Sequence, residues 1–163
     1  GAIGIDREGW VRRLLGTPSN SDVTEDLMFT GVHILSPEAF EAMPESGCVI
    51  RTAYRQWVDS GAPVLGIVDD SPWADLGTVS EYHRLNLELA SGSVAWPGVE
   101  PRGGCILAAS VEPSERIQRS VIGEGVTLTV GVTLERCVVW PGTQVTESAT
   151  NAVLTPEHRV ELS

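Results

Sequence analysis

One short stretch of the chain combines residue types that could bind a metal ion and phosphate groups. It reads Trp-Ala-Asp-Leu-Gly-Thr over residues 73–78. The apolar run at residues 64–69 predicts a strand before it, and the pattern after it predicts a helix. Asp75 therefore lies between the end of a strand and the start of a helix, where open α/β sheets bind ligands. A carboxylate there can bind a hard cation whose other ligands are phosphate oxygens.

A simpler role for Asp75 stays open. A carboxylate just ahead of a helix also helps the turn and interacts favourably with the positive end of the helix dipole. Trp73 likewise has two interpretations, because an indole ring can fill a core or form the apolar wall of a sugar pocket. The residue types alone do not choose between these roles.

The helix that positions Asp75 has clear sequence signals at both ends. Thr78 and Glu81 have the spacing of a capping box, which makes Thr78 the N-terminal cap. Apolar residues then recur at helical spacing at Tyr82, Leu85 and Leu89. Gly92 stands where such a helix would end. Within this helix, His83 is expected at the surface.

Residues upstream of this helix predict a sheet. Residues 1–15 predict two strands around a turn, residues 17–26 a polar loop, and residues 27–35 a third strand. The first strand opens the sequence without a lead-in, so the chain is expected to start inside a larger fold. A glycine inside a strand, here Gly31, marks a bulge or the close approach of a ligand or another backbone. His33 in the same run is expected to be structural.

Two helices are predicted between residues 36 and 61. The first begins with a serine cap followed by proline, and Phe40 and Met43 are expected to face the core. The second ends at a glycine. Its apolar stripe consists of Ile50, Tyr54, Trp57 and Val58. Arg51 and Arg55 lie one turn apart on this helix, where they either meet a phosphate or form a solvated face.

The last third of the chain carries a repeat of period six. Its aliphatic residues fall at two phases, Ile122, Leu128 and Leu134 in one and Val126, Val132 and Val138 in the other. This pattern favours a hexapeptide-repeat β-helix, with the aliphatic side chains stacked inside, over an ordinary amphipathic sheet. Three hexads make about one turn of a triangular prism, so its ends need covering by the rest of the protein or by another subunit. Residues 147–163 are polar and are expected to fray or to pack on a neighbour.

Taken together, these motifs resemble a known family. Trp-x-Asp-x-Gly-Thr at residues 73–78, the run Phe-Thr-Gly-Val-His-Ile-Leu-Ser-Pro at residues 29–37 and the repeat tail resemble the sugar-1-phosphate nucleotidyltransferases. The likeness is to bacterial NDP-sugar pyrophosphorylases of the mannose-1-phosphate guanylyltransferase type. It implies an α/β fold in three parts. Residues 1–92 would be the C-terminal, sugar-binding part of a Rossmann-like nucleotidyltransferase domain, residues 93–104 a linker, and residues 105–163 a short left-handed parallel β-helix with its tail.

The resemblance also implies a reaction and a site. The full enzyme would join a nucleoside triphosphate to a sugar 1-phosphate and release pyrophosphate. Asp75 would be catalytic, as one of two carboxylates that hold Mg²⁺ between the phosphates. Phe29, Gly31 and Trp73 would shape the sugar pocket. The choice of mannose and GTP rests on the likeness alone.

The chain departs from the family in two places. It contains no Gly-rich G-x-G-T-R loop, so the nucleotide-binding half of the fold is expected to be missing and the chain alone to be inactive. Many relatives have Glu-Lys-Pro where this chain has Gly16-Thr17-Pro18, so the lysine that meets the sugar phosphate has no counterpart.

Two other functions fit parts of the sequence. A non-catalytic sugar-phosphate-binding or oligomerisation module would keep the fold, and a homo-oligomer is a possible assembly, because hexapeptide tails often mediate association. Acyltransferases share the repeat, but they need a long prism and usually a catalytic histidine within it. His158 lies outside the hexads, which disfavours an acyltransferase.

The bulk composition excludes other classes of partner. Asp and Glu number 22 against 11 Lys and Arg, for a net charge of −11. Nucleic acids and anionic membranes attract basic surfaces, so neither is an expected partner. The sequence shows no signal-peptide pattern and no apolar run long enough to span a bilayer. Cys48, Cys105 and Cys137 are expected to be buried, reduced thiols, which favours the cytoplasm.

Overall fold

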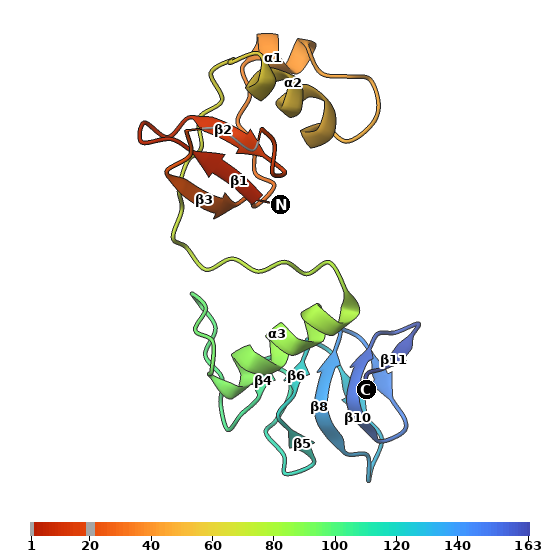
Figure 1. The fold of residues 1–163 in the computed structure, drawn as a ribbon. Helices are drawn as coiled ribbons and strands as arrows, with labels where there is room; N and C mark the ends of the chain where they lie inside the picture. Colours follow the sequence, from red (N-terminus) through yellow and green to blue (C-terminus); the bar gives the residue numbers. More distant parts are fainter. Residues whose placement is uncertain (1, 19–21) are drawn as a thin grey trace. The chain divides into compact units, whose positions relative to one another are not determined.

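The computed structural model describes residues 2–18 and 22–163. Part of the predicted polar loop, residues 19–21, lies outside the described residues. The chain divides into two compact units, Gly1–Trp73 and Ala74–Ser163, called unit 1 and unit 2 below (Figure 1). The sequence places a linker later, at residues 93–104. The helix before that linker packs on strands of unit 2, so in the structure it belongs to the same compact unit as they do.

Unit 1 begins with a three-stranded antiparallel sheet. Its strands are β1 (Ala2–Ile5), β2 (Val11–Leu14) and β3 (Glu25–Met28), in the order β2-β1-β3. Ile5, Val11 and Leu14 are buried. Gly9 has a φ of 88° in the turn between the first two strands, a conformation that glycine adopts readily. The predicted strand pair over residues 1–15 is confirmed.

The other two strand predictions are wrong. β3 ends at Met28 rather than at residue 35, and Gly31 has a φ of 87°, which no extended strand has. Residues 64–69 form only an isolated bridge between Trp10 and Leu65. One edge of this segment is hydrogen-bonded to the first hairpin, through Gly66 N to Gly9 O at 2.9 Å. Among the described residues no strand pairs with the other edge, so the segment cannot join a sheet on both sides.

The two predicted helices of unit 1 are present. α1 (Pro37–Glu41) begins at Ser36, whose hydroxyl accepts a hydrogen bond from Ala39 N. The second helix starts as a π-helical turn, η1 (Ile50–Tyr54), and continues as α2 (Arg55–Asp59). The prediction that Phe40 faces the core is wrong, because its side chain is 69% exposed and α1 carries no buried residue.

Unit 2 opens with the helix predicted after Asp75. α3 (Val79–Ser91) begins at Thr78 and ends at Gly92, which has a left-handed φ of 75°. The helix lies across strands β6, β8 and β10 of the unit (Figure 1). His83 is buried rather than exposed, and its Nε2 lies 2.7 Å from the carbonyl oxygen of Arg136. The histidine is therefore part of the packing between α3 and the strands.

The remainder of unit 2 is a β-helix of about three turns. Its strands are β4 (Ile106–Leu107), β5 (Ile117–Gln118), β6 (Val121–Ile122), β7 (Thr127–Leu128), β8 (Leu134–Val139), β9 (Gln144–Val145) and β10 (Ala149–Leu154). They pair in parallel with strands one coil away, as β4-β6-β8-β10, β5-β8 and β7-β9. Val121 pairs with Val138 and Leu134 with Ala149, so successive coils are offset by 17 and then 15 residues. The prediction of a parallel β-helix is confirmed, the predicted length of about one turn is wrong, and its left-handedness stays a prediction.

The six-residue spacing places one aliphatic side chain on each of three successive strands. Ile122, Leu128 and Leu134 lie on β6, β7 and β8, and all three belong to or pack against one hydrophobic core. Val132 is also in that core. Val138 of the second phase is buried but lies outside that core, whereas its neighbour Val139 belongs to it, so the prediction that Val138 stacks inside is wrong.

The prediction that residues 147–163 fray is wrong. β10 adds a further layer, and β11 (Arg159–Glu161) pairs with it in antiparallel fashion. The buried residues of β10 are Ala149, Ala152, Val153 and Leu154. Ala149, Ala152 and Leu154 belong to the interior core. β11 covers the open edge of the last strand, as an exposed sheet edge requires.

The cysteine prediction holds only in part. Cys105 and Cys137 are buried free thiols, whereas Cys48 is exposed. Cys48 lies just before η1, and hydrogen bonds from the backbone amides of Arg51 and Ile50 lower the pKa of its thiol. Within residues 2–18 and 22–163, every helix is too short or too polar to cross a lipid bilayer.

The core of the β-helix can be tested by two valine substitutions that remove the same atoms. Val132 is 5% exposed and Val130 is 91% exposed. We expect Val132→Ala to lower the free energy of unfolding by about 2 kcal/mol, because two buried methyl groups are lost and a cavity is left. Val130→Ala should change it by less than about 0.5 kcal/mol. Urea unfolding followed by circular dichroism measures both, and equal losses would contradict the predicted interior.

Candidate functional site

Asp75 lies in unit 2, in the turn just before α3, and its side chain is exposed. In the part of the chain that the structure describes, its carboxylate makes no hydrogen bond and no ion pair. Its Oδ1 lies 3.4 Å from the position that a Cβ atom on Gly77 would occupy, and Glu81 Oε2 lies 3.8 Å from the same position. Gly77 thus leaves open the space beside two carboxylates.

The start of α3 does not need Asp75. Thr78 Oγ1 accepts a hydrogen bond from Glu81 N at 3.2 Å and donates one to Glu81 Oε2 at 2.8 Å. The capping box is therefore formed by Thr78 and Glu81 alone. A carboxylate that neither caps the helix nor pairs with a cation of the described chain is free to bind an external ligand.

Asp75 has the chemistry of a single magnesium ligand. Mg²⁺ in phosphate-transfer sites is bound through one or two carboxylates, with water and substrate phosphates as the other ligands. Across residues 2–18 and 22–163, no group of three or more His, Cys, Asp or Glu side chains could hold a metal ion by itself. The residues present thus fit an ion shared with phosphates rather than a closed protein cage.

Phe29 and Gly31 lie together in the loop that follows β3 in unit 1. Phe29 belongs to an aromatic cluster with His33, Tyr54 and Trp57. Its ring lies 5.0 Å from that of His33 in an edge-to-face contact, and Tyr54 contacts both His33 and Trp57 at 5.1 Å. His33 Nδ1 and the hydroxyl of Tyr54 are 2.7 Å apart. The loop is thus anchored to the helix η1–α2.

This cluster was not apparent in the sequence. The sequence assigns its members separately to a strand and to a helical stripe, and nothing in their spacing links residue 33 to residue 54. Burial raises the pKa of the Tyr54 phenol above its ordinary value. The hydrogen bond to Tyr54 accounts for His33 as a structural residue.

Gly31 has open space where a side chain would be. No atom lies within 4 Å of its ideal Cβ position, and its φ of 87° is the reason for glycine there. Trp73 is the last residue of unit 1, and it is 44% exposed. Of the four residues predicted for the site, three thus belong to unit 1 and Asp75 to unit 2.

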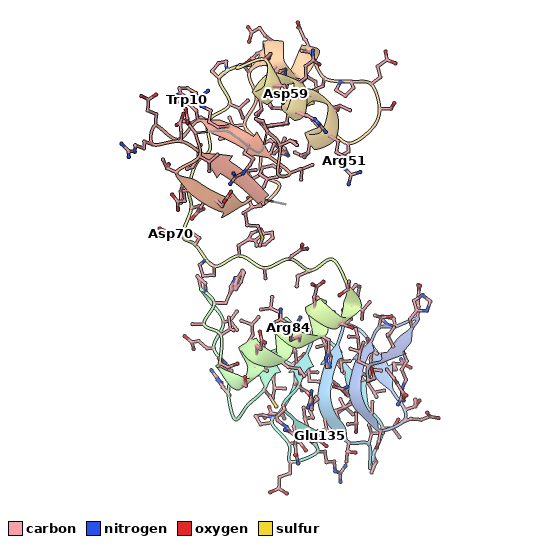
Figure 2. The ribbon with its side chains drawn as sticks, in the orientation of Figure 1. Trp10, Arg51, Asp59, Asp70, Arg84 and Glu135 are labelled. Atoms are coloured by element: carbon pink, nitrogen blue, oxygen red, sulfur yellow. The ribbon has the colours of Figure 1, made fainter. Side chains whose placement is uncertain are left out.

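Arg51 and Arg55 line a hollow of about 480 Å³ on the surface of η1 and α2. Figure 2 labels Arg51 and Asp59, the two ends of this surface. Arg55 Nε lies 3.8 Å from Asp59 Oδ2 one turn later, and both side chains are more than half exposed. This arrangement is typical of a solvated helix face.

Unit 1 exposes many large apolar side chains in two segments. The first segment, residues 28–40, exposes Met28, Val32, Ile34 and Phe40, and the second, residues 65–68, exposes Leu65, Ile67 and Val68. The second segment is the one with an unpaired backbone edge. We call these seven residues the exposed apolar set. Concentrations of exposed apolar surface usually mark a place where another part of a protein binds.

Comparison with known proteins gives two distant relatives. No protein-family model matches the chain. A UTP–glucose-1-phosphate uridylyltransferase from Synechocystis sp. is 25% identical over 118 residues, which cover 68% of this chain and 30% of the relative. A mannose-1-phosphate guanylyltransferase from Mycobacterium tuberculosis is 25% identical over 152 residues, which cover 89% of this chain and 42% of the relative.

The chain therefore spans less than half the length of either curated relative that it matches. Both relatives are named as sugar-1-phosphate nucleotidyltransferases, although their names give different bases and sugars. The two alignments support a similarity of the present chain to this general family.

Proposed function

We propose that this chain is the sugar-binding part and the β-helix of a sugar-1-phosphate nucleotidyltransferase. The whole protein would join a nucleoside triphosphate to a sugar 1-phosphate and release pyrophosphate. The observation that carries the proposal is the unpaired, exposed carboxylate of Asp75 in the Trp-x-Asp-x-Gly-Thr turn, directly ahead of a helix that is capped without it. Mannose 1-phosphate and GTP are the finer proposal, which rests on the motif likeness and on one of the two relatives.

In this reaction a sugar-phosphate oxygen attacks the α-phosphorus of the triphosphate, the bond to the β-phosphate oxygen breaks, and pyrophosphate leaves. Such transfers depend on positioning and on neutralising charge more than on acid–base chemistry. A bound Mg²⁺ would act as a Lewis acid and as a template for the phosphates. Asp75 would hold that ion from the protein side, together with a second carboxylate from the nucleotide-binding half.

The sugar would be held by Phe29, Gly31 and Trp73. Aromatic faces bind the apolar faces of sugar rings, and Trp73 keeps part of its indole exposed for such contact. The hydrogen bond between His33 and Tyr54 fixes the loop that carries Phe29 and Gly31. The open space beside Gly31 allows a ligand to approach the backbone.

We further propose that the exposed apolar set packs against the nucleotide-binding half of the same fold. Ile67 is 75% exposed, and one backbone edge of its segment is unpaired. A partner at this segment would therefore make both apolar contacts and main-chain hydrogen bonds. The length of the two relatives leaves room for such a half. A homo-oligomer formed through the β-helix is a second proposed association.

The catalytic proposal is tested by assaying pyrophosphate release with nucleoside triphosphates and hexose 1-phosphates. The 163-residue chain alone should release none, because it lacks a triphosphate-binding loop. In a longer protein that adds the nucleotide-binding half, Asp75→Asn should lower kcat by about a hundredfold or more, because a ligand of the ion is lost. Asp70→Asn, the same change at an exposed aspartate labelled in Figure 2, is the control and should keep activity. Unchanged turnover of Asp75→Asn would favour a non-catalytic module.

The role of Asp75 as a ligand rather than a helix-stabilising residue is tested by stability. Thr78→Ala should lower the free energy of unfolding by about 1 kcal/mol, because the cap is lost. Asp75→Asn should change it by less than about 0.5 kcal/mol, because its carboxylate has no partner in the described chain. Thermal unfolding of the 163-residue chain gives both values. A loss for Asp75→Asn as large as that for Thr78→Ala would show that the carboxylate serves the helix.

The proposed packing of the exposed apolar set is tested by introducing a charge. Ile67→Lys should leave the stability of the 163-residue chain nearly unchanged, because the side chain is already in water. In the longer protein the same lysine would be buried in an apolar contact, so stability and turnover should both fall. Val130→Lys, at a valine that is 91% exposed on the β-helix, is the control and should affect neither. If Ile67→Lys leaves the stability and the turnover of the longer protein unchanged, this contact is ruled out.

A further inference from the structure

β11 lies at one end of the six-stranded sheet of the β-helix, and its outer backbone edge is unpaired. The strands of this sheet follow the order β11-β10-β8-β6-β4, and among the described residues no strand pairs with the outer side of β11. Figure 1 shows β11 beside β10 in unit 2. An unpaired edge is a template for a further strand, so the residues on it decide which strand can pair there.

The hydrogen bonds between β11 and β10 determine which backbone groups point outward. Leu162 N donates a hydrogen bond to the carbonyl oxygen of Asn151 at 2.8 Å, in continuation of the register of the two strands. In an antiparallel pair, residues bonded to the partner strand alternate with residues whose N–H and C=O groups point the other way. Val160, two residues before Leu162, is therefore also bonded to β10. Arg159 and Glu161 point their backbone groups to the free edge.

Val160 is the last member of a row of valines on the side of the sheet that α3 covers. Val138 pairs with Val153, and Val153 pairs with Val160, so the three side chains lie on one face. Val138 and Val153 are buried but lie outside the interior core, on strands that α3 contacts. Val160 is 39% exposed. Burial of the row thus stops at the edge, where another apolar side chain would complete it.

The sequence of β11 is complementary to itself in charge. When two copies of the strand run antiparallel with Val160 opposite Val160, Arg159 of each copy lies opposite Glu161 of the other. These are the positions with outward backbone groups, so each Arg159–Glu161 pair can also exchange its main-chain hydrogen bonds. The neighbouring registers place Arg159 opposite Arg159 or Glu161 opposite Glu161, and like charges directly opposite each other are destabilising. One register therefore satisfies both the backbone and the charges.

The ion pairs within one chain are compatible with this arrangement. Arg159 contacts Glu161 at 2.7 Å and Glu147 at 3.9 Å, and all three residues are exposed. Across the paired strands, the arginines and glutamates at positions 159 and 161 would alternate in sign. Each charge would then gain an opposite neighbour and lose none.

We propose that two copies of this chain form a dimer by pairing β11 with β11 around a two-fold axis at Val160. The sheets of the two β-helices become one continuous sheet, and the two valine rows meet at the axis. This inference rests on the proposed association through the β-helix and not on the proposed reaction, so either can fail without the other. If the charges on β11 serve only to keep the edge unpaired, the chain is a monomer.

The test is sedimentation equilibrium of the 163-residue chain at about 0.15 M salt, which screens the repulsion between chains of net charge −11. Because the contact is small, the monomer should convert to dimer as the concentration is raised toward about 1 mM. Arg159→Glu should weaken dimerisation by at least about tenfold, because both cross-strand pairs become like-charged. Glu161→Arg should weaken it similarly, although it makes the chain less acidic.

Two controls separate this contact from other effects. Arg116→Glu, the same charge change at an exposed arginine of the β-helix outside β11, should alter dimerisation less than about twofold. Ile67→Lys should also leave it unchanged, which distinguishes the β11 contact from association through the exposed apolar set. Circular dichroism confirms that each variant is folded.

A mixture of the two charge-reversal variants tests the register itself. In a heterodimer of Arg159→Glu with Glu161→Arg, each cross-strand pair again joins opposite charges, so the mixture should dimerise although neither variant does so alone. A chain with both substitutions should dimerise like the original, and it replaces a single variant that does not fold. The proposal is overturned if the original chain stays a monomer up to about 1 mM, if Arg116→Glu weakens dimerisation as much as Arg159→Glu, or if neither the mixture nor the double variant dimerises.

Discussion

The exposure of Asp75 depends on where α3 begins, and the hydrogen bonds between Thr78 and Glu81 cap the helix at that point. Because the helix is capped by these two residues, the preceding turn holds Asp75 out in solvent with an unpaired carboxylate. From the same start, α3 runs across the β-helix, where His83 bonds to the backbone of Arg136. One cap therefore positions both the proposed metal ligand and the helix that packs on the β-helix.

The two units differ in how completely they bury their apolar side chains and pair their strand edges. The β-helix encloses a continuous aliphatic core, and β11 covers the edge of its last strand. Unit 1 buries a few residues between its sheet and its short helices but leaves the exposed apolar set in water. An extended apolar segment with one unpaired edge is unfavourable in a finished domain. This contrast is the physical basis for proposing that unit 1 is completed by another part of the fold.

Local signals in the sequence were enough to predict an element where its own residues specify it. The cap at Thr78 and the stop at Gly92 each act within one element, and the structure confirms them. The first phase of the six-residue repeat likewise predicted residues that belong to or pack against the core. The motif containing Asp75 was also readable, because the carboxylate and the capped helix are adjacent in the chain. Its role in binding stays a prediction.

Only the tertiary structure decided features that depend on distant partners. Residues 64–69 have the composition of a strand, but a strand requires a neighbour on its edge, and a sequence does not state which neighbours are present. Residues 149–154 look polar in part, yet the preceding coil pairs with them and buries their small side chains. The contact of His33 with Tyr54 likewise arises from packing. Periodicity and caps are local properties of the chain, whereas pairing and burial depend on what folds beside it.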